Sequence, residues 1–257
     1  MNVRRTGRHR SLRPRRLTYM SAPQRIALVT GANRGLGLET ARQLARHGIA
    51  VVLTSRDGIT GKAATDKLQA EGLPVRYHPL DVTREASIRR LTDYLTLTFE
   101  RLDILINNAA TTPKEGGHPL LELELDALRT TMETNVYGPL RLVQRLLPLM
   151  QRNRYGRIVN ISSAAAIESE SHSEPASFRF SKQALNTLTR MLHEEAADEN
   201  ILINAVIPGW KSSQQPPKQN NASPSPAEIV GGVIWAATLP AGSPSGVLFR
   251  NGKQIAW

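Results

Sequence analysis

The sequence has no cysteine and no long uninterrupted run of apolar residues. The first absence excludes disulfides, thiolate metal ligands and cysteine nucleophiles, and no metal site is expected. The second excludes a transmembrane helix, which needs about 18 or more consecutive apolar residues. The apolar core of a secretory signal is also missing. We therefore expect a soluble protein without a membrane span that resides in the cytoplasm.

The chain carries a formal net charge of +11, and much of that excess lies at its beginning. Residues 1–20 contain seven arginines and no acidic residue, which leaves an ordinary surface charge of +4 for the other residues. We expect residues 1–24 to be a disordered basic extension, because their composition cannot build a core. The extension could contact polyanions, act as a transit peptide, precede a true start at Met20 or have no function. A nucleic-acid partner is not the favoured interpretation.

A length of 257 residues with 40% hydrophobic residues suits one α/β domain, which we expect to span residues 25–257. Short β-rich runs alternate with helical patterns, as in βαβ units around a parallel sheet. Several of the runs are almost continuously Val, Ile or Leu, which is typical of strands covered on both faces. We therefore predict a Rossmann-type, doubly wound, mainly parallel sheet with helices on both faces. Its seven expected strands are Ile26–Thr30, Ala50–Thr54, Val75–His78, Ile104–Asn107, Arg157–Ile161, Leu202–Val206 and Val247–Phe249.

Helical periodicity marks the segments between these strands. Ala41, Leu44, Ala45 and Gly48 recur on one face between the first two strands, and two long helices are expected over Leu120–Met150 and Ala176–Ala197. Residues 212–226 are rich in Pro, Ser, Gln and Asn, which indicates a surface excursion that could cover a ligand crevice.

A glycine-rich turn directly follows the first predicted strand and opens the first helix. Its glycines would let the backbone approach a pyrophosphate, whose charge the N–H groups and the positive end of the helix would stabilise. The position between a strand and a helix makes this pattern much more informative than glycines alone. The residues expected to contact the cofactor here are Gly31, Asn33, Arg34, Gly35, Leu36 and Gly37.

The end of the second strand favours NADP(H) over NAD(H). An acid at this place would bind the ribose 2′-hydroxyl, but the strand ends in Thr54-Ser55-Arg56. Arg56 and Arg34 could instead pair with a 2′-phosphate. The alternative is that Arg56 is merely solvated and that Asp57 binds the ribose.

Together with other motifs, Thr30–Gly37 resembles the signature of the short-chain dehydrogenase/reductase family, and the resemblance covers nearly the whole chain after Ser21. Within this family the phrasing is most similar to carbonyl reductases. The matching motifs are Leu80-Asp81-Val82, Asn107-Asn108-Ala109-Ala110, Asn135-Val136-Tyr137-Gly138, Ile158–Ser163 and Pro208-Gly209. The resemblance implies cofactor contacts at Asp81, Val82, Asn108, Ala109, Lys182, Pro208 and Gly209, and catalytic positions at Asn135, Ser163, Phe178 and Lys182.

The catalytic pair of the family is Tyr-x-x-x-Lys, and here Phe178 stands where the tyrosine is expected, four residues before Lys182. In the resembled mechanism the tyrosine donates a proton to the developing alkoxide while hydride arrives from the nicotinamide. Lysine lowers the pKa of that tyrosine and holds the ribose, serine binds the substrate oxygen, and asparagine maintains a water relay. Phenylalanine has no proton to give, so we expect impaired activity in an intact cofactor site.

No obvious replacement for the tyrosine stands out. His172, Ser173 and Ser177 precede the helix closely, but a histidine in a Ser- and Glu-rich loop is more often a surface residue. Tyr155 lies at the wrong end of its strand. Two more departures are Ala110, where the family has glycine, and the segment after Trp210, where Ser213 could still contact the carboxamide.

These observations favour an NADP(H)-dependent oxidoreductase that interconverts a small carbonyl and an alcohol with reduced activity. The alternative is a non-catalytic NADP(H)-binding regulatory or scaffold protein. Nucleic-acid attachment through the arginine-rich extension ranks below both. The two long helices resemble surfaces through which family members pair, so a homodimer or homotetramer is expected.

Overall fold

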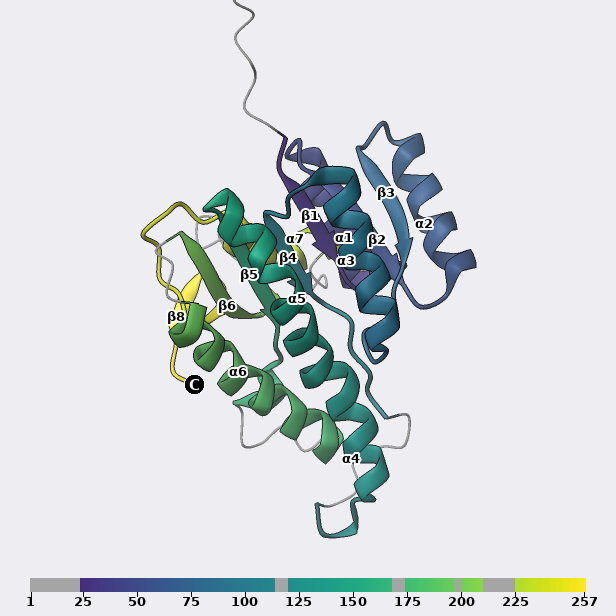
Figure 1. Cartoon of the computed structure of the whole chain (residues 1–257). Coiled ribbons are helices and arrows are strands. Elements are labelled where there is room, and N and C mark those ends of the chain that lie inside the picture. The colour runs from purple at the N-terminus through teal and green to yellow at the C-terminus, as the bar shows by residue number, and fades with distance from the viewer. Residues whose placement is uncertain (1–23, 114–119, 168–173, 197–199, 210–224) are drawn as a thin grey trace, which may run out of the picture.

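A computed structural model of the chain describes residues 24–113, 120–167, 174–196, 200–209 and 225–257 (Figure 1). The predicted basic extension, apart from Gln24, therefore lies outside the described residues, as do His172, Ser173, Ser213 and nearly all of the predicted excursion 212–226.

The fold is built around one sheet with the strand order β3-β2-β1-β4-β5-β6-β7-β8. All neighbouring strands from β3 to β7 are parallel, and the chain order reverses between β1 and β4. This arrangement confirms the predicted Rossmann-type, doubly wound sheet. The strands are β1 (Ile26–Val29), β2 (Ala50–Ser55), β3 (Val75–Pro79), β4 (Ile104–Asn107), β5 (Gly156–Ile161), β6 (Ile201–Ile207), β7 (Leu248–Arg250) and β8 (Lys253–Ile255).

The predicted number of seven strands was one too low among the described residues. The additional strand, β8, pairs antiparallel with β7 at the edge of the sheet. Asn251 and Gly252 join the two strands, with φ angles of 51° and 68°. Positive φ at both central residues is what a tight two-residue hairpin requires, and an Asn-Gly pair supplies it at little cost.

Helices cover both faces of the sheet, so the strands alternate side chains into two hydrophobic cores. One core contains side chains of α1, α2 and α7, and the other contains those of α3, α5 and α6. In β1, for example, Ala27 and Val29 enter the first core, whereas Ile26 and Leu28 enter the second. In Figure 1 the helices α3, α5 and α6 cross the near face of the sheet. The helices are α1 (Gly35–Arg46), α2 (Gly58–Ala70), α3 (Glu85–Phe99), α4 (Leu125–Met132), α5 (Gly138–Asn153), α6 (Ala176–Ala196) and α7 (Pro226–Ala237).

The prediction of one continuous helix over Leu120–Met150 was wrong. A short 3₁₀ turn (Leu120–Glu122) precedes α4, and a π-helical segment (Glu133–Tyr137) separates α4 from α5. The wider turn carries Asn135, which is buried and holds the loop after β4 through two hydrogen bonds with the backbone of Thr111. Helical periodicity does not reveal such a turn, because the apolar pattern continues through it.

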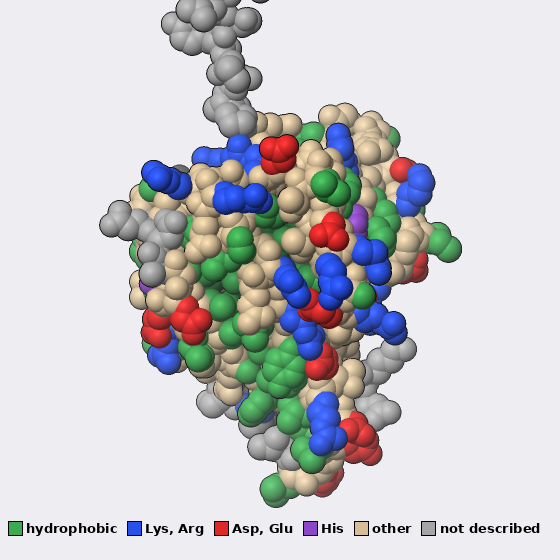
Figure 2. Space-filling model, in the orientation of Figure 1, with side chains coloured by type: hydrophobic (Ala, Val, Ile, Leu, Met, Phe, Trp, Pro, Cys, Tyr) green, Lys and Arg blue, Asp and Glu red, His purple; other side chains and the backbone are tan. Residues whose placement is uncertain are grey.

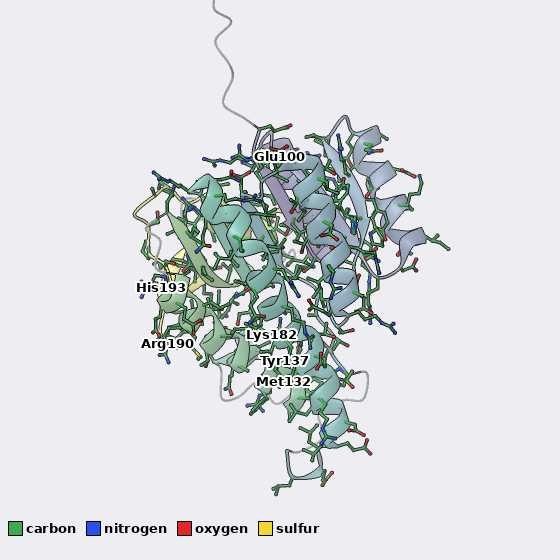
Figure 3. The ribbon with its side chains drawn as sticks, in the orientation of Figure 1. Glu100, Met132, Tyr137, Lys182, Arg190 and His193 are labelled. Atoms are coloured by element: carbon green, nitrogen blue, oxygen red, sulfur yellow. The ribbon has the colours of Figure 1, made fainter. Side chains whose placement is uncertain are left out.

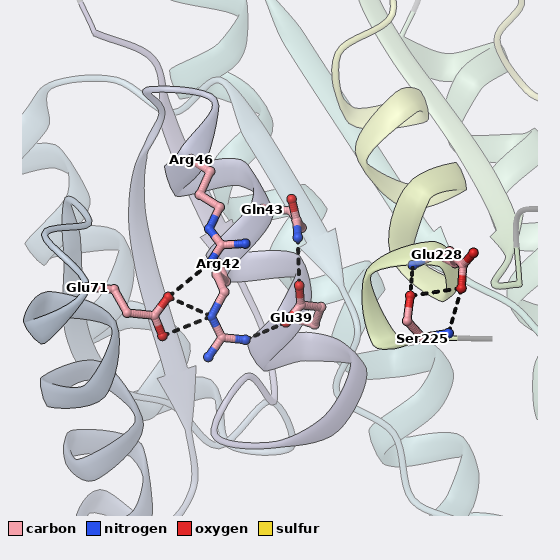
Figure 4. A network of polar contacts seen from close by, with 7 residues as sticks. All are labelled: Glu39, Arg42, Gln43, Arg46, Glu71, Ser225 and Glu228. Carbon is pink, nitrogen blue, oxygen red and sulfur yellow. Dashed lines mark hydrogen bonds and ion pairs between the residues drawn. The ribbon is translucent and has the colours of Figure 1, made fainter. Parts of the chain in front are cut away.

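Polar contacts fix the helix that begins at the glycine turn. Arg42 of α1 pairs with Glu39 of the same helix and with Glu71 at the end of α2, and Arg46 also reaches Glu71 (Figure 4). At the start of α7, Ser225 and Glu228 form a reciprocal capping box. Because α7 packs against α1, these contacts help to fix the position of α1, the helix that the glycine turn opens. Among the described residues, none of the helices is both long enough and apolar enough to cross a membrane.

Candidate active site

The glycine turn is clamped by the end of the neighbouring strand β4. The Thr30 hydroxyl donates to the Ile106 carbonyl and accepts hydrogen bonds from the backbone N–H groups of Asn108 and Ala109. In return, the Asn108 side-chain amide donates to the carbonyls of Thr30 (2.8 Å) and Gly31 (3.1 Å). Thr30 and Asn108 therefore determine the shape of the turn.

At two positions of the turn, steric crowding leaves no room for a side chain and requires glycine. A Cβ on Gly37 would lie 2.5 Å from Asn108 Nδ2 and 2.7 Å from the Gly31 carbonyl oxygen, and one on Gly31 would lie 2.9 Å from the Cα of Ala109. Gly31 also has a φ of 61°, in the left-handed region that favours glycine. A side chain at either position would push the backbone out of place.

The first turn of α1 is left without a side-chain partner. Its N-cap, Arg34, makes no capping hydrogen bond, and the first turn holds no acidic residue. Since the first N–H groups of a helix need an acceptor and carry partial positive charge, this end suits an anion. The residues present therefore fit the pyrophosphate of a dinucleotide.

A cavity of about 400 Å³ opens beside this turn, at the carboxyl ends of β1, β2 and β4. Open α/β sheets bind ligands in this crevice, where the strand order reverses. The cavity brings together eleven residues predicted from the sequence: Gly31, Asn33, Arg34, Gly35, Leu36, Gly37, Arg56, Asp81, Val82, Asn108 and Ala109. It is also lined by Asp57, the alternative ribose-binding residue, and by Ser55, Leu80, Thr83, Ala110 and Thr134, which had not been predicted as cofactor contacts.

Asp57 and Arg56, the two candidates for binding the ribose end of the cofactor, differ in the contacts that they already make. Asp57 is the N-cap of α2, and its Oδ1 accepts hydrogen bonds from the backbone N–H groups of Ile59 (2.8 Å) and Thr60 (3.2 Å). Arg56 is exposed and lies near enough to Asp81 to contribute to the lowered pKa of that carboxyl. Burial opposes this lowering, but the hydrogen bonds from Thr83 and the charges of Arg56 and Arg84 outweigh it.

The predicted catalytic positions gather around the start of α6. Phe178 and Lys182 lie one turn apart on this helix, with Lys182 Nζ 5.5 Å from the centroid of the Phe178 ring. The Lys182 side chain is buried, and its Nζ donates to the carbonyl of Ile161 at the end of β5 (2.7 Å). Burial lowers the Lys182 pKa from 10.5 to about 8, because the charged form loses hydration. In Figure 3, Lys182 on α6 is labelled, as are Met132 at the end of α4 and Tyr137 at the end of the π-helical segment.

Asn135 reaches this region from the π-helical segment, and Ser163 lies two residues after Ile161, whose carbonyl accepts from Lys182. Asn135 Nδ2 donates to the Ser181 hydroxyl (2.9 Å), which in turn donates to the Phe178 carbonyl (2.7 Å). Ser163 follows β5, where its hydroxyl oxygen accepts a hydrogen bond from Ala165 N at 3.2 Å. Asn135 is thus linked to the turn of α6 that carries Phe178.

A polar seam, missed in the sequence, joins α6 to β5 beside Lys182. We use this name for the pairs Asn186–Ser162 and Thr189–Asn160, each joined by a side-chain hydrogen bond. Asn160 also accepts from Asn107 of β4. The signal for it was available, because Asn160 interrupts an apolar strand and Asn186 and Thr189 follow Lys182 at helical spacing.

The remaining predicted positions are Pro208 and Gly209, and Tyr155, which had been rejected as a replacement for the tyrosine, lies elsewhere. Pro208 and Gly209 follow the end of β6, where Gly209 has a φ of 114° and donates its N–H to Ile229 O. Tyr155 precedes β5, at the opposite end of the strand from Ser163, and the guanidinium groups of Arg25 and Arg157 each lie over its ring.

Comparisons with known proteins agree with this geometry. The family model described as short chain dehydrogenase matches residues 25–222. Carbonyl reductase [NADPH] 1 of Sus scrofa is 31% identical, over 93% of this chain and 96% of that protein. A metagenomic short-chain oxidoreductase in complex with NADP has a TM-score of 0.74 at 29% identity, over 88% of this chain and 96% of that one. A variant of actinorhodin polyketide ketoreductase with NADPH has a TM-score of 0.76 at 26% identity, covering 89% and 97%.

Proposed function

The chain belongs to the short-chain dehydrogenase family, and from that premise we propose that it is an NADP(H)-dependent oxidoreductase acting on a small carbonyl compound or the corresponding alcohol. The observation that carries this proposal is the glycine-lined cavity with the uncapped start of α1 at its edge. It is supported by relatives named carbonyl reductase [NADPH] and by similar structures that hold NADP or NADPH.

The preference for NADP(H) rests on the ribose end of the cavity. Arg34 and Arg56 both line it and can pair with a 2′-phosphate. Asp57, the residue that would instead bind a 2′-hydroxyl, already uses one carboxylate oxygen to cap α2. The adenine end would be contacted by Asp81 and Val82, and Asn108 and Ala109 would border the middle of the cofactor.

The bound cofactor would supply or accept the hydride, and the residues around α6 would bind and orient the substrate. We assign Ser163 to a hydrogen bond with the substrate oxygen and Lys182 to the ribose beside the nicotinamide. Pro208 and Gly209 would border the nicotinamide, and Asn135 would hold the loop after β4 and the start of α6 in place. Phe178 cannot donate a proton, so we propose that turnover is slower than it would be with tyrosine.

A second candidate function is a non-catalytic NADP(H)-binding protein that regulates or scaffolds a partner. Phe178 favours it, since the glycine turn and Arg56 line a cavity suited to the cofactor while the acid of the family motif is missing. The two candidates share their cofactor and differ only in turnover.

The test is a fluorescence titration of the full chain with NADPH and NADH, followed by NADPH oxidation with small ketones, aldehydes and quinones. We expect tighter binding of NADPH and slow oxidation with at least one carbonyl class. Binding without oxidation of any substrate would favour the second candidate. Absence of NADPH binding would refute both.

The expected homodimer or homotetramer stays a proposal. Hydrophobic side chains gather on the surface over the lower part of α5 and over α4 (Figure 2), and Leu125 of α4 and Tyr137, just before α5, are exposed. Sedimentation of the full chain would measure the state of association. The single domain over residues 25–257 and the cytoplasmic location are likewise predictions, which limited proteolysis and cell fractionation can test.

A further inference from the structure

The Lys182 ammonium is only partly satisfied by the protein. One of its three protons is donated to the Ile161 carbonyl, and the other two have no acceptor among the described residues. The side chain is only 4% exposed, so solvent does not replace these acceptors freely. A buried cation with unused donors is costly unless something else in the site accepts from it.

The charged groups around Lys182 are engaged elsewhere. On the elements packed against α6, Asp126 pairs with Arg129 on α4, Glu133 of the π-helical segment pairs with Arg141, and Arg157 of β5 binds backbone carbonyls at the far end of that strand. β6 and the 3₁₀ turn after Ser163 carry no charged side chain. Tyr137 of the π-helical segment is exposed.

The charged side chains of α6 itself also form no ion pair with Lys182. They are Arg179, Arg190, His193, Glu194 and Glu195, and none of them shifts the pKa of Lys182, for which burial is the sole cause. The same holds for the groups on the neighbouring elements. Among the described residues, Lys182 is therefore an isolated cation beside the ring that replaces the family's proton donor.

We propose that Lys182 is itself the proton donor in carbonyl reduction by this protein, in place of the phenol that Phe178 lacks. This inference rests on the proposed function and assigns to Lys182 a step beyond positioning. Its two unused protons and its contact with the Phe178 ring place it beside the vacated donor position.

The step balances without any further reactant. The bound cofactor would supply a hydride to the carbonyl carbon, and the electron pair of the C=O π bond would move to oxygen. That oxygen takes a proton from Lys182 Nζ, directly or through one intervening hydroxyl, and the N–H bonding pair stays on nitrogen. The neutral amine then regains a proton from solvent.

The acidity of Lys182 suits this role. Its pKa of about 8 lies near neutral pH, where a general acid is most effective. Reduction should therefore require the protonated amine and fall by about tenfold per pH unit well above pH 8.

The experiment compares wild type, Lys182→Arg, Phe178→Tyr/Lys182→Arg and, as a control, Lys253→Arg on the exposed strand β8. Single-turnover reduction and NADPH affinity are measured from pH 6.5 to 9.5. Arginine keeps the charge and the hydrogen-bond donors but does not release a proton, so we expect at least a tenfold loss of rate in Lys182→Arg with NADPH affinity within about threefold. In Phe178→Tyr/Lys182→Arg the added phenol should restore the rate. If lysine only positioned the cofactor, the phenol would not be expected to restore it. Lys253→Arg should behave like wild type.

A readout independent of activity is NMR of the protein labelled at lysine Cε. One resonance, absent from Lys182→Arg and present in Lys253→Arg, should titrate near pH 8. The inference is overturned by a flat wild-type pH profile, by an undiminished rate in Lys182→Arg, or by a Lys182 resonance that titrates near 10.5. NADPH binding with no turnover except in Phe178→Tyr/Lys182→Arg would overturn it and leave the cofactor assignment standing. Absence of NADPH binding would refute the proposed function itself.

Discussion

At the scale of single residues, Phe178 differs from the side chain expected at its position by one oxygen atom. The residues around it are in place, since Lys182 contacts its ring and Asn135 is bonded to Ser181 in the same turn of α6. The backbone of this turn is held by the hydrogen bond from Ser181 to the Phe178 carbonyl, which the ring substituent does not affect. We therefore expect a hydroxyl added to the ring to leave the backbone of this turn unchanged.

We predict that Phe178→Tyr raises carbonyl reduction by at least about tenfold, the lower end of what a positioned proton donor contributes. NADPH affinity should be nearly unchanged, because the residues of the glycine turn are untouched. Single-turnover rates and a cofactor titration measure both quantities.

Ser163→Ala in the Phe178→Tyr background supplies the control. It should remove most of the gain, since the new phenol and the serine would act on one substrate oxygen. A thermal melt must accompany it, because Ser163 also accepts a hydrogen bond at the start of the 3₁₀ turn. An unchanged rate on Phe178→Tyr would mean that the pocket does not admit the carbonyl in the expected place.

The cofactor preference is also determined by single residues. Arg56→Ala should weaken NADPH binding by about 10- to 150-fold, equivalent to about 1.5–3 kcal/mol for one charge-assisted contact, and should leave NADH binding unchanged. Arg84→Ala is a suitable control, since Arg84 also lies near Asp81 but does not line the cavity. Equal losses for both cofactors, or an unaltered preference, would show that another group reads the 2′ position.

At the scale of elements, the turn between β1 and α1 depends on the absence of a side chain at Gly37. A Cβ there would lie 2.7 Å from the Gly31 carbonyl oxygen and 2.9 Å from the Cα of Ala32, so the backbone itself has to move. Gly37→Ala should reduce NADPH affinity at least tenfold and lower the free energy of unfolding by about 1–3 kcal/mol.

A matched control for this change is Gly58→Ala at the start of α2. Its Cβ would meet only the Tyr77 hydroxyl, at 3.8 Å, and its φ is not in the left-handed region. Urea unfolding and the NADPH titration should not distinguish it from wild type by more than about 0.5 kcal/mol. If Gly37→Ala binds NADPH as wild type does, the turn is not the cofactor cradle.

The elements that local sequence patterns determine were predicted well. Runs such as Ile104–Asn107 are strands with the expected bounds, and the glycine turn lies where its spacing placed it. β8 was missed although the pair Asn251-Gly252 is a hairpin signal, because Lys253–Ile255 is short and weakly apolar. The capping box of Ser225 and Glu228 would similarly have marked the start of α7.

Other features depend on contacts between distant segments. The π-helical segment forms where Asn135 turns inward to bond the backbone of Thr111, a partner 24 residues away. The polar seam pairs Asn186 with Ser162 and Thr189 with Asn160, across the packing of α6 on β5. Helical spacing places Asn186 and Thr189 on one face of α6, but it does not identify their partners or the partner of Asn135, since these contacts exist only in the folded chain.

At the scale of the whole molecule, the buried Lys182 ammonium opposes folding. The native pKa of about 8 lies below the ordinary value of 10.5, so below pH 8 the folded state carries a cost of about 3 kcal/mol that the unfolded state does not. Between pH 8 and 10.5 the unfolded state binds more protons than the native state. The contribution of this group to stability therefore rises with pH across that window.

Lys182→Met should consequently stabilise the cofactor-free protein at pH 7, by about 1–3 kcal/mol, since methionine keeps most of the apolar stem and removes the charge. The lost hydrogen bond to the Ile161 carbonyl offsets part of the gain. Urea unfolding at pH 7, 8.5 and 10 measures the difference from wild type, which should shrink steadily as pH rises, whereas Lys253→Met on β8 should show no such trend. A variant that is less stable than wild type at pH 7, or a difference independent of pH, would mean that the charge on Lys182 does not destabilise the folded state. The stabilising variant should also lose carbonyl reduction, because the charge that weakens the fold is the one that the proposed chemistry uses.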